Sequence, residues 1–288
     1  MEQEKIEEYY VQYKRLLFTL AYQLTGSAAD AEDVVHDVFM KLHDIELDRI
    51  VEPKAYLCKM ATNRCLDVLK TARRKREQYV GQWLPEPILT FGNELVESVI
   101  QKELISYAML VLLEKLTPVE RAAFVLYEAL SFKYSVIAKI IGKNEANCRK
   151  LVSRARGKIG ISKEAPLREA EIEGKWIEGF LTALEQGDLN RVISILAEDV
   201  TLISDGGGKA FAAIHPIQSR NLVARFLLGI TKNVTRGDDV VEVTEINGQI
   251  GLVYRSGHQV DTVALLHVRE GVVRNLYFIR NPEKLRYI

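Results

Sequence analysis

The chain has 288 residues, a formal net charge of zero and a hydrophobic fraction of 48%. This length allows two or three domains, and the hydrophobic fraction is that of an ordinary soluble protein with packed cores. A neutral chain excludes overall basicity as a reason for binding nucleic acid, so any such binding has to come from local clusters of charge.

The cysteine spacing and the length of the apolar runs indicate the cellular compartment of the protein. Cys58, Cys65 and Cys148 form no metal-binding spacing and no even disulfide framework, which indicates reduced thiols in a cytoplasmic protein. The acidic, amphipathic N-terminus is unlike a signal peptide, and no run reaches the ~18 apolar residues of a membrane span. We therefore expect no membrane contact, no metal and no cofactor.

Two amphipathic helices are predicted first. Over residues 4–25, apolar side chains recur every three or four positions, and Gly26 ends the helix. Ser27 can cap a second helix over about 28–44, whose core-facing positions are Ala31, Val34, Val35, Val38, Phe39 and Leu42. Its other face carries Asp30, Glu32, Asp33 and Asp37. The helix dipole favours acidic residues in the first turn, but it does not account for Asp37, which lies further along the helix. The alternative is that the exposed acidic patch docks a basic partner.

A third helix is predicted from Pro53 through the basic run that follows. Asn63, Arg64 and Asp67 place polar groups in its middle, and Lys70 begins its basic end. Cations suit a helix C-terminus, which explains part of this run. The four consecutive basic residues 73–76 exceed what capping needs, and they favour a surface that binds a nucleic-acid backbone.

Residues 77–98 interrupt the helical pattern and form a linker. Pro85 and Pro87 exclude a regular helix there. Trp83, Leu84 and neighbouring apolar residues are unusual for a flexible tether, which is typically rich in glycine, serine or charge. Two interpretations remain open: the linker packs on a folded surface, or Trp83 fills a gap in the N-terminal core.

Residues 116–159 have the outline of a helix-turn-helix. Thr117, Pro118 and Glu120 form a helix start with an N-cap, a first-turn proline and a capping-box glutamate. A short second helix follows, and Gly142 stands just past its end, where a left-handed turn favours glycine. A third helix then runs from about residue 144 to 159.

This third helix is apolar on one face and basic on the other. Its polar face carries Lys143, Asn144, Asn147, Arg149, Lys150, Ser153, Arg154, Arg156 and Lys158, and its apolar face includes Ala146, Cys148 and Val152. Basic side chains neutralise phosphates, whereas Asn and Arg can contact base edges. A solvated face of an ordinary bundle helix would need neither the turn glycine nor the amides, so we favour a recognition helix in the DNA major groove.

From residue 171 onward, helices are followed by strands. Two amphipathic helices are predicted over 174–188 and 189–199, the second capped by Asp188 or its neighbour. Strands are predicted at 200–204, 240–246, 250–255, 263–268 and 272–279, with a helix at about 216–231 and turns at 247–248, 256–257 and 270–271. This order predicts an α+β domain with helices on a curved sheet that ends in an antiparallel meander.

Two stretches of the N-terminal part resemble region 2 of an extracytoplasmic-function (group IV) sigma factor: GSAADAEDVVHDVFMKLHD and PKAYLCKMATNRCLDVLKTARRKRE. The helix-turn-helix resembles region 4 of the same family, and together the two blocks cover roughly residues 4–160. The resemblance implies two all-α domains that bind promoter DNA and core RNA polymerase, the latter at its β′ clamp and β flap.

The resemblance also implies roles for the polar faces. The acidic helix docks on the clamp, which assigns polymerase binding to Asp30, Glu32, Asp33, His36 and Asp37. The third helix opens the −10 element and flips a base into a pocket, which assigns −10 contacts to Asn63, Arg64, Lys70, Arg73, Arg74 and Arg76. The recognition helix reads the −35 element through the polar residues from Lys143 to Arg156 named above. One departure is that only Tyr56 offers an aromatic ring for base stacking on the third helix.

The C-terminal order of elements resembles a SnoaL-like, NTF2-like cone, whose interior is a pocket. Three motifs resemble those of sigma factors with such an extension: WLPEP (Trp83, Leu84, Pro85 and Pro87), DGGGK (Asp205, Gly206, Gly207, Gly208 and Lys209) and NPEKL (Asn281, Pro282, Lys284 and Leu285). The glycines allow a tight turn and the close approach of a partner; they could also cradle an anion, although a turn is the simpler interpretation.

The predicted organisation is therefore region 2 over 1–78, a linker over 79–100, region 4 over 101–162 and a SnoaL-like regulatory domain over 163–288. SnoaL-type cyclases use acid–base residues in their pocket, for which His215, His258, Asp261 and His267 are the candidates. We assign no catalytic residue and expect no enzyme, since no nucleophile–base pair is visible and a fold alone does not transfer function.

We predict an alternative sigma factor whose C-terminal domain modulates its activity in cis. The main alternative is a small-molecule sensor or enzyme in which the cone pocket binds or converts a ligand. A stand-alone repressor that uses only the helix-turn-helix would leave the region 2 resemblance unexplained.

Overall fold

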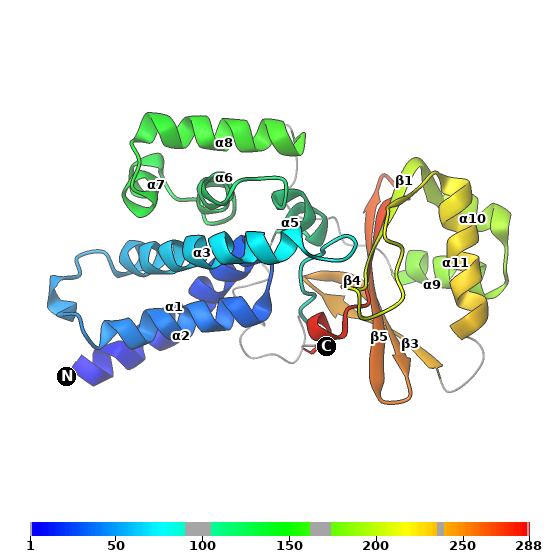
Figure 1. Cartoon of the computed structure of the whole chain (residues 1–288), viewed down its shortest axis with the longest axis horizontal. Coiled ribbons are helices and arrows are strands. Elements are labelled where there is room, and N and C mark those ends of the chain that lie inside the picture. The colour runs from blue at the N-terminus through cyan, green and yellow to red at the C-terminus, as the bar shows by residue number, and fades with distance from the viewer. Residues whose placement is uncertain (1, 90–104, 162–173, 235–238, 287) are drawn as a thin grey trace. The chain divides into compact units, whose positions relative to one another are not determined.

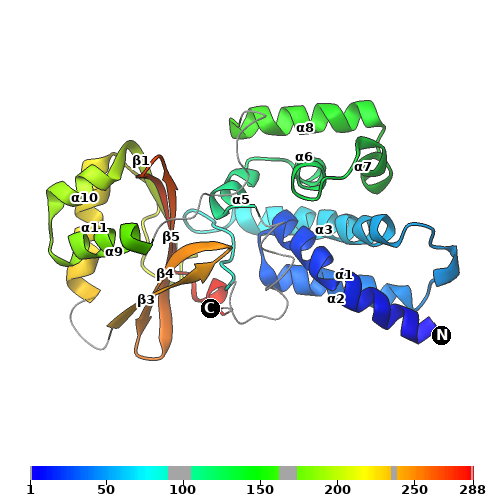
Figure 2. The ribbon, with the colours of Figure 1, turned by 180° about the vertical axis from the view of Figure 1, so that it is seen from behind.

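The structure is a computed structural model that describes residues 2–89, 105–161, 174–234, 239–286 and 288 (Figures 1 and 2). Contacts divide the chain into two compact units. We call the first the helical unit; it comprises Met1–Glu77, Gly92–Ile105 and Met109–Leu167. We call the second the C-terminal unit; it comprises Gln78–Phe91, Ser106–Ala108 and Arg168–Ile288, and thus includes the described part of the linker.

The first part of the helical unit is built from three long helices. They are α1 (Glu2–Thr25), α2 (Ala28–Leu42) and α3 (Pro53–Glu77), with a short 3-10 helix at Leu47–Arg49. The apolar stripe of α1 is buried as predicted, with Leu17, Leu20 and Leu24 fully inaccessible. Ser27 caps α2 by accepting a hydrogen bond from the Asp30 backbone at 3.2 Å, and every predicted core position of α2 is buried. Helical periodicity thus defined this core correctly.

The helix-turn-helix forms the second part of this unit. Its elements are α5 (Tyr107–Leu113), whose first two residues belong to the C-terminal unit, α6 (Pro118–Phe124), a π-helical turn η2 (Val125–Ala129), α7 (Tyr134–Ile141) and α8 (Glu145–Ile159). Thr117 and Glu120 form the predicted capping box, and Gly142 ends α7 in the left-handed conformation at φ +64°. The predicted single helix from Pro118 differs at its end, because the chain widens into a π-helical turn over its last residues.

A buried arginine joins the two parts of the helical unit. Arg121 is only 3% exposed, and its guanidinium donates to the backbone carbonyls of Leu24 at 2.8 Å and Leu113 at 3.1 Å. The last carbonyls of a helix lack partners within the helix, so a cation at the end of α1 and α5 is well placed. Among the described residues, no helix is both long and apolar enough to cross a membrane.

The C-terminal unit is a six-stranded sheet with helices packed on it. Its helices are α9 (Gly174–Glu185), α10 (Leu189–Ile195), α11 (Arg220–Val234) and a 3-10 helix η3 (Pro282–Lys284). Its strands are β1 (Leu196–Asp205), β2 (Ile217–Gln218), β3 (Asp239–Ile246), β4 (Gln249–Ser256), β5 (Gln259–Arg269) and β6 (Val272–Ile279). The strand order is β2-β1-β6-β5-β4-β3, and only β1 and β6 run parallel. Figure 1 shows α9, α10 and α11 on one side of this sheet, which gives the predicted α+β cone.

The local signals placed most of these elements correctly. Asp188 caps α10 by accepting from the Arg191 backbone at 3.0 Å. The β3–β4 and β5–β6 turns have both central residues at positive φ, as Asn-Gly and Glu-Gly pairs allow. The prediction of a helix through residue 199 was wrong, because β1 begins at Leu196. Leu196 pairs with Val273 of β6 and is buried, so sheet pairing overrides the local helical pattern.

Candidate DNA-binding, polymerase-binding and regulatory sites

The predicted recognition helix α8 presents a polar face to solvent. Asn144 caps it by accepting from the Asn147 backbone at 2.8 Å, while Cys148, Val152, Ala155 and Ile159 are buried. The exposed residues on and just before α8 are Lys143, Asn144, Asn147, Arg149, Lys150, Ser153 and Arg154. Ala146 is exposed as well, so its predicted inward orientation was wrong. The exposed set has the hydrogen-bonding groups that phosphates and base edges require.

Two basic residues of α8 are committed to contacts within the protein. Arg156 donates through Nε to Glu128 at 2.8 Å, and this pair is largely buried. Lys158 contacts Glu120 of the capping box at 2.7 Å. Burial tends to raise the pKa of Glu120, but hydrogen bonds from Lys158 and Thr117 outweigh it, so this pKa lies below its ordinary value. These two cations therefore stabilise the packing of α8 on α6 and η2.

The acidic face of α2 separates into exposed and paired residues. Glu32, Asp33 and His36 are exposed, whereas Asp30 is partly buried in the first turn. Asp37 accepts a hydrogen bond from Arg64 Nε of α3 at 2.6 Å. This pair explains the acidic position that the helix dipole did not explain, since it joins α2 to α3.

A hollow of about 320 Å³ lies between α2 and α3. Its lining brings together Asp37, Val38, Lys41, Met60, Asn63, Arg64 and Asp67. Asn63 and Arg64 thus share one concave surface, whereas Lys70 pairs with Asp67 at 2.8 Å. Tyr56 is partly buried and does not line the hollow. Arg73, Arg74 and Arg76 continue α3, but their side chains lie outside the part that the structure describes.

The strongest polar cluster of the C-terminal unit surrounds the motif residue Asp205, which is fully buried. One carboxylate oxygen accepts from the Tyr79 hydroxyl at 2.6 Å, and the other accepts from the Leu84 backbone N–H at 2.8 Å. The ammonium of Lys284 completes the cluster at 2.6 Å from Asp205. Linker, DGGGK motif and NPEKL motif therefore meet at one buried carboxylate.

Lys284 holds the linker by three kinds of contact. It donates to the Leu84 carbonyl at 2.5 Å, pairs with Asp205, and lies 4.1 Å from the centre of the Trp83 ring. Asn281 adds a hydrogen bond from Nδ2 to the Tyr79 hydroxyl at 2.8 Å. Burial and the hydrogen bond to Asp205 raise the pKa of Tyr79, so its phenol keeps its proton. We call this set, Tyr79, Leu84, Asp205, Asn281 and Lys284, the linker clamp.

The glycines of the DGGGK motif permit this approach. Gly207 has φ +57°, and a Cβ atom there would stand 2.8 Å from the Tyr79 hydroxyl and collide with the Asn281 side chain. Lys209 pairs instead with Glu283, which joins the two motif loops at the surface. The DGGGK motif thus forms a tight turn, and the segment that approaches it closely is the chain's own linker.

Further hydrogen bonds hold the linker against the C-terminal unit. Two hydrogen bonds join Ile88 to Asn247: the Asn247 backbone N–H donates to the Ile88 carbonyl at 2.9 Å, and the Asn247 side-chain oxygen accepts from the Ile88 N–H at 3.1 Å. Tyr107 donates its hydroxyl to the Pro85 carbonyl at 2.6 Å. Of the two open interpretations of the linker, the structure supports packing on a folded surface. Residues 90–104 lie outside the described part.

Comparison with known proteins identifies the family. The Sigma-70 region 2 family matches residues 9–75, and the Sigma-70 region 4 family matches residues 106–159. The chain is 33% identical to the ECF RNA polymerase sigma factor SigJ of Mycobacterium tuberculosis, over 93% of this chain and 89% of that protein. This chain is an extracytoplasmic-function sigma factor.

Further relatives agree with this assignment. The crystal structure of Mycobacterium tuberculosis SigJ matches this sigma factor with a TM-score of 0.77 at 30% identity, over 95% of both chains. A probable ECF sigma factor SigI of the same species is 31% identical over 64% of each chain. Membership of this family confirms the prediction of a sigma factor, which binds core RNA polymerase and directs promoter-specific initiation. The sensor and repressor alternatives are not favoured, because neither accounts for both sigma regions.

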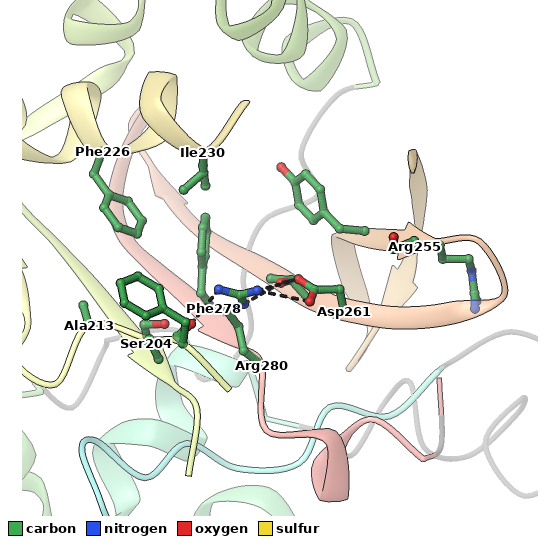
Figure 3. Close-up of a pocket in the computed structure, with 13 residues that line it drawn as sticks. Ser204, Ala213, Phe226, Ile230, Arg255, Asp261, Phe278 and Arg280 are labelled. Carbon is green, nitrogen blue, oxygen red and sulfur yellow. Dashed lines mark hydrogen bonds and ion pairs between the residues drawn. The ribbon is translucent and has the colours of Figure 1, made fainter. Parts of the chain in front are cut away.

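The cone of this sigma factor also contains a pocket, shown in Figure 3. Of the candidate acid–base residues, Asp261 lines it, whereas His215, His258 and His267 do not. His267 instead shares a hydrogen bond with Asn275 at 2.9 Å on the neighbouring strand. Sequence reasoning missed Arg280, which lines the same pocket, pairs with Asp261 at 2.8 Å and directly precedes the NPEKL motif.

Proposed function

We propose that the C-terminal unit regulates this sigma factor in cis by holding its linker. The linker joins the two regions that must engage the −10 and −35 elements of one promoter, so fixing its path limits the placements open to them. The observation that carries the proposal is the linker clamp. In it, a buried Lys284–Asp205 ion pair binds both polar groups of the Leu84 backbone: Asp205 accepts from its N–H, and Lys284 donates to its carbonyl. Another path of the linker would take the Leu84 N–H and carbonyl away from this buried pair, and buried polar groups that lose a hydrogen-bond partner are costly.

We further propose the contacts that the sigma regions make. The −35 element is read by α8 through Lys143, Asn144, Asn147, Arg149, Lys150, Ser153 and Arg154, which share its exposed face. Arg156 is left out, because Glu128 occupies its guanidinium. The −10 element is contacted by Asn63, Arg64 and Lys70, with Arg73, Arg74 and Arg76 on the backbone. Core polymerase is contacted by Glu32, Asp33 and His36, with Asp30 and Asp37 at the edge of that surface.

The C-terminal unit needs no catalytic activity for this role. The one candidate acid–base residue that lines its pocket, Asp261, is paired with Arg280 at 2.8 Å. A general base has to be free to accept a proton from a substrate, and an arginine that donates to both carboxylate oxygens opposes that. The cytoplasm, where polymerase and chromosome meet, is the compartment that this proposal implies.

The test of cis regulation is in vitro transcription with core polymerase. The full chain is compared with Lys284→Met and with a 1–165 truncation on a promoter that the full chain recognises. Lys209→Met is the matched control, since it removes an exposed lysine of the neighbouring motif. We expect the first two to change initiation in the same direction and the control to match the parent. Equal output from all four proteins at equal concentration would refute regulation through the linker.

The polymerase contact is tested by a charge reversal. Asp33→Arg should reduce co-purification with core polymerase, because it reverses an exposed charge in the centre of the acidic face. Glu178→Arg makes the same change at an exposed position of α9 and serves as control. If both variants bind core polymerase as the parent does, the assignment of α2 is wrong.

A further inference from the structure

The pocket of the C-terminal unit is of the size and character of a ligand site. Its volume is about 360 Å³, within the ~300–1,000 Å³ typical of small-molecule sites. Four aromatic side chains, those of Phe211, Phe226, Tyr254 and Phe278, line it together with Ile230, Ala212 and Ala213. Figure 3 shows Phe226 and Ile230 of α11 facing Phe278 of β6 across this space. Aromatic walls on several sides favour a ligand with a flat ring system.

A closed ion pair forms the polar side of the pocket. Arg280 donates from one nitrogen to both carboxylate oxygens of Asp261, at 2.8 and 3.1 Å (Figure 3). Its other nitrogens donate to the Thr262 hydroxyl at 3.0 Å and to the Phe211 carbonyl at 2.5 Å. The guanidinium is therefore neutralised and largely occupied before any ligand arrives. Arg255, the other arginine of the lining, is paired with Glu242 at 3.2 Å.

The remaining polar groups of the lining are neutral hydroxyls. Ser204 is 2% exposed, and its side chain lines the pocket from β1. Burial raises the pKa of Tyr254 to about 12, so its phenol is protonated at neutral pH and can donate or accept a hydrogen bond. A buried anionic group would find no uncompensated cation here, and burying it unpaired is costly. Neutral hydroxyl or carbonyl groups match these partners.

We propose that this pocket binds a small, neutral aromatic molecule that carries a hydroxyl or carbonyl group. Phe211 is the residue that would cover it. This side chain is 89% exposed, stands in the segment between β1 and β2, and is anchored through its own carbonyl by Arg280. An aromatic ring that lines a pocket and is otherwise open to water gains contact when a flat ligand enters. The proposal goes beyond cis regulation, which requires no ligand.

The proposal is tested by binding of the neutral fluorescent probe N-phenyl-1-naphthylamine to the full chain. We expect saturable binding with a blue-shifted emission. Two competitors of nearly equal size, 2-naphthol and 2-naphthoate, then test charge, and the neutral naphthol should displace the probe at about tenfold lower concentration or less. No saturable binding, or naphthoate competing as well as naphthol, would overturn the proposal.

Variants locate the binding in the pocket. Phe211→Ala should weaken binding of the probe several-fold, whereas Ile214→Ala, a 59% exposed residue nearby that does not line the pocket, should not. Both side chains are mostly in water, so both variants are expected to fold. Asp261→Asn leaves Arg280 uncompensated and should reverse the preference toward 2-naphthoate. Equal effects of the two alanine variants together with an unchanged preference in Asp261→Asn would place the probe elsewhere and refute the site.

Discussion

Replacing Lys284 by Met tests the energetic importance of the linker clamp directly. Methionine keeps the length of the side chain but removes the ammonium that lies 2.6 Å from Asp205. Asp205 is fully buried and would keep two partners, the Tyr79 hydroxyl and the Leu84 N–H, while the Leu84 carbonyl would lose its lysine donor. Removing one partner of a buried ion pair costs about 3–5 kcal/mol, a large part of the ~5–15 kcal/mol by which domains are stable.

The assay is equilibrium unfolding by urea, followed by tryptophan fluorescence. Both tryptophans of the chain, Trp83 and Trp176, belong to the C-terminal unit, so the signal reports that unit alone. Lys284→Met should lower its free energy of unfolding by about 3–5 kcal/mol, and Asp205→Asn in the same chain should restore part of the loss, because no charge then remains buried. Lys209→Met breaks an exposed pair and should cost under ~1 kcal/mol. If Lys284→Met costs no more than Lys209→Met, water solvates Asp205 and the clamp reasoning fails.

Three further predictions concern other parts of the chain. Gly207→Ala should destabilise the C-terminal unit by at least about 1–2 kcal/mol more than Gly248→Ala in the same urea assay. Both glycines have positive φ, but only at Gly207 does a Cβ atom meet the linker clamp, so equal losses would contradict the close approach. Arg149→Ala or Arg154→Ala should weaken promoter binding by the holoenzyme by about 1–3 kcal/mol in a manner that depends on the −35 sequence. A loss that is uniform across −35 variants would indicate a phosphate contact instead. The lowered pKa of Glu120 means that its stabilising contribution is present above its ordinary pKa and is lost as the pH falls below it. The midpoint temperature of thermal unfolding of the helical unit, measured by circular dichroism from pH 7 to 3, should therefore fall less steeply with pH in Glu120→Gln than in the parent. Identical slopes would exclude this role.

Local sequence determined the elements of both units and the identity of the family. The apolar stripes of α1 and α2, the capping box at Thr117 and the left-handed Gly142 depend on side chains within one or two helical turns, so their periodicity and spacing could be read directly. The exposed basic face of α8 followed from the same periodicity. Such signals are short-range, because a cap or a turn is satisfied by its immediate neighbours.

Only the tertiary structure decided which side chains meet across the chain. Asp205 lies 126 residues from Tyr79 and 79 residues from Lys284 in the sequence. No local pattern indicates that Tyr79 and Lys284 both contact the buried Asp205 carboxylate. Arg156 was predicted to contact DNA, and only the fold shows that its guanidinium pairs with Glu128, 28 residues away. The start of β1 at Leu196 was likewise decided by its pairing with β6. In each case the competing local preferences differ by little, whereas burial of a charge or a strand depends on the partner that the whole fold supplies.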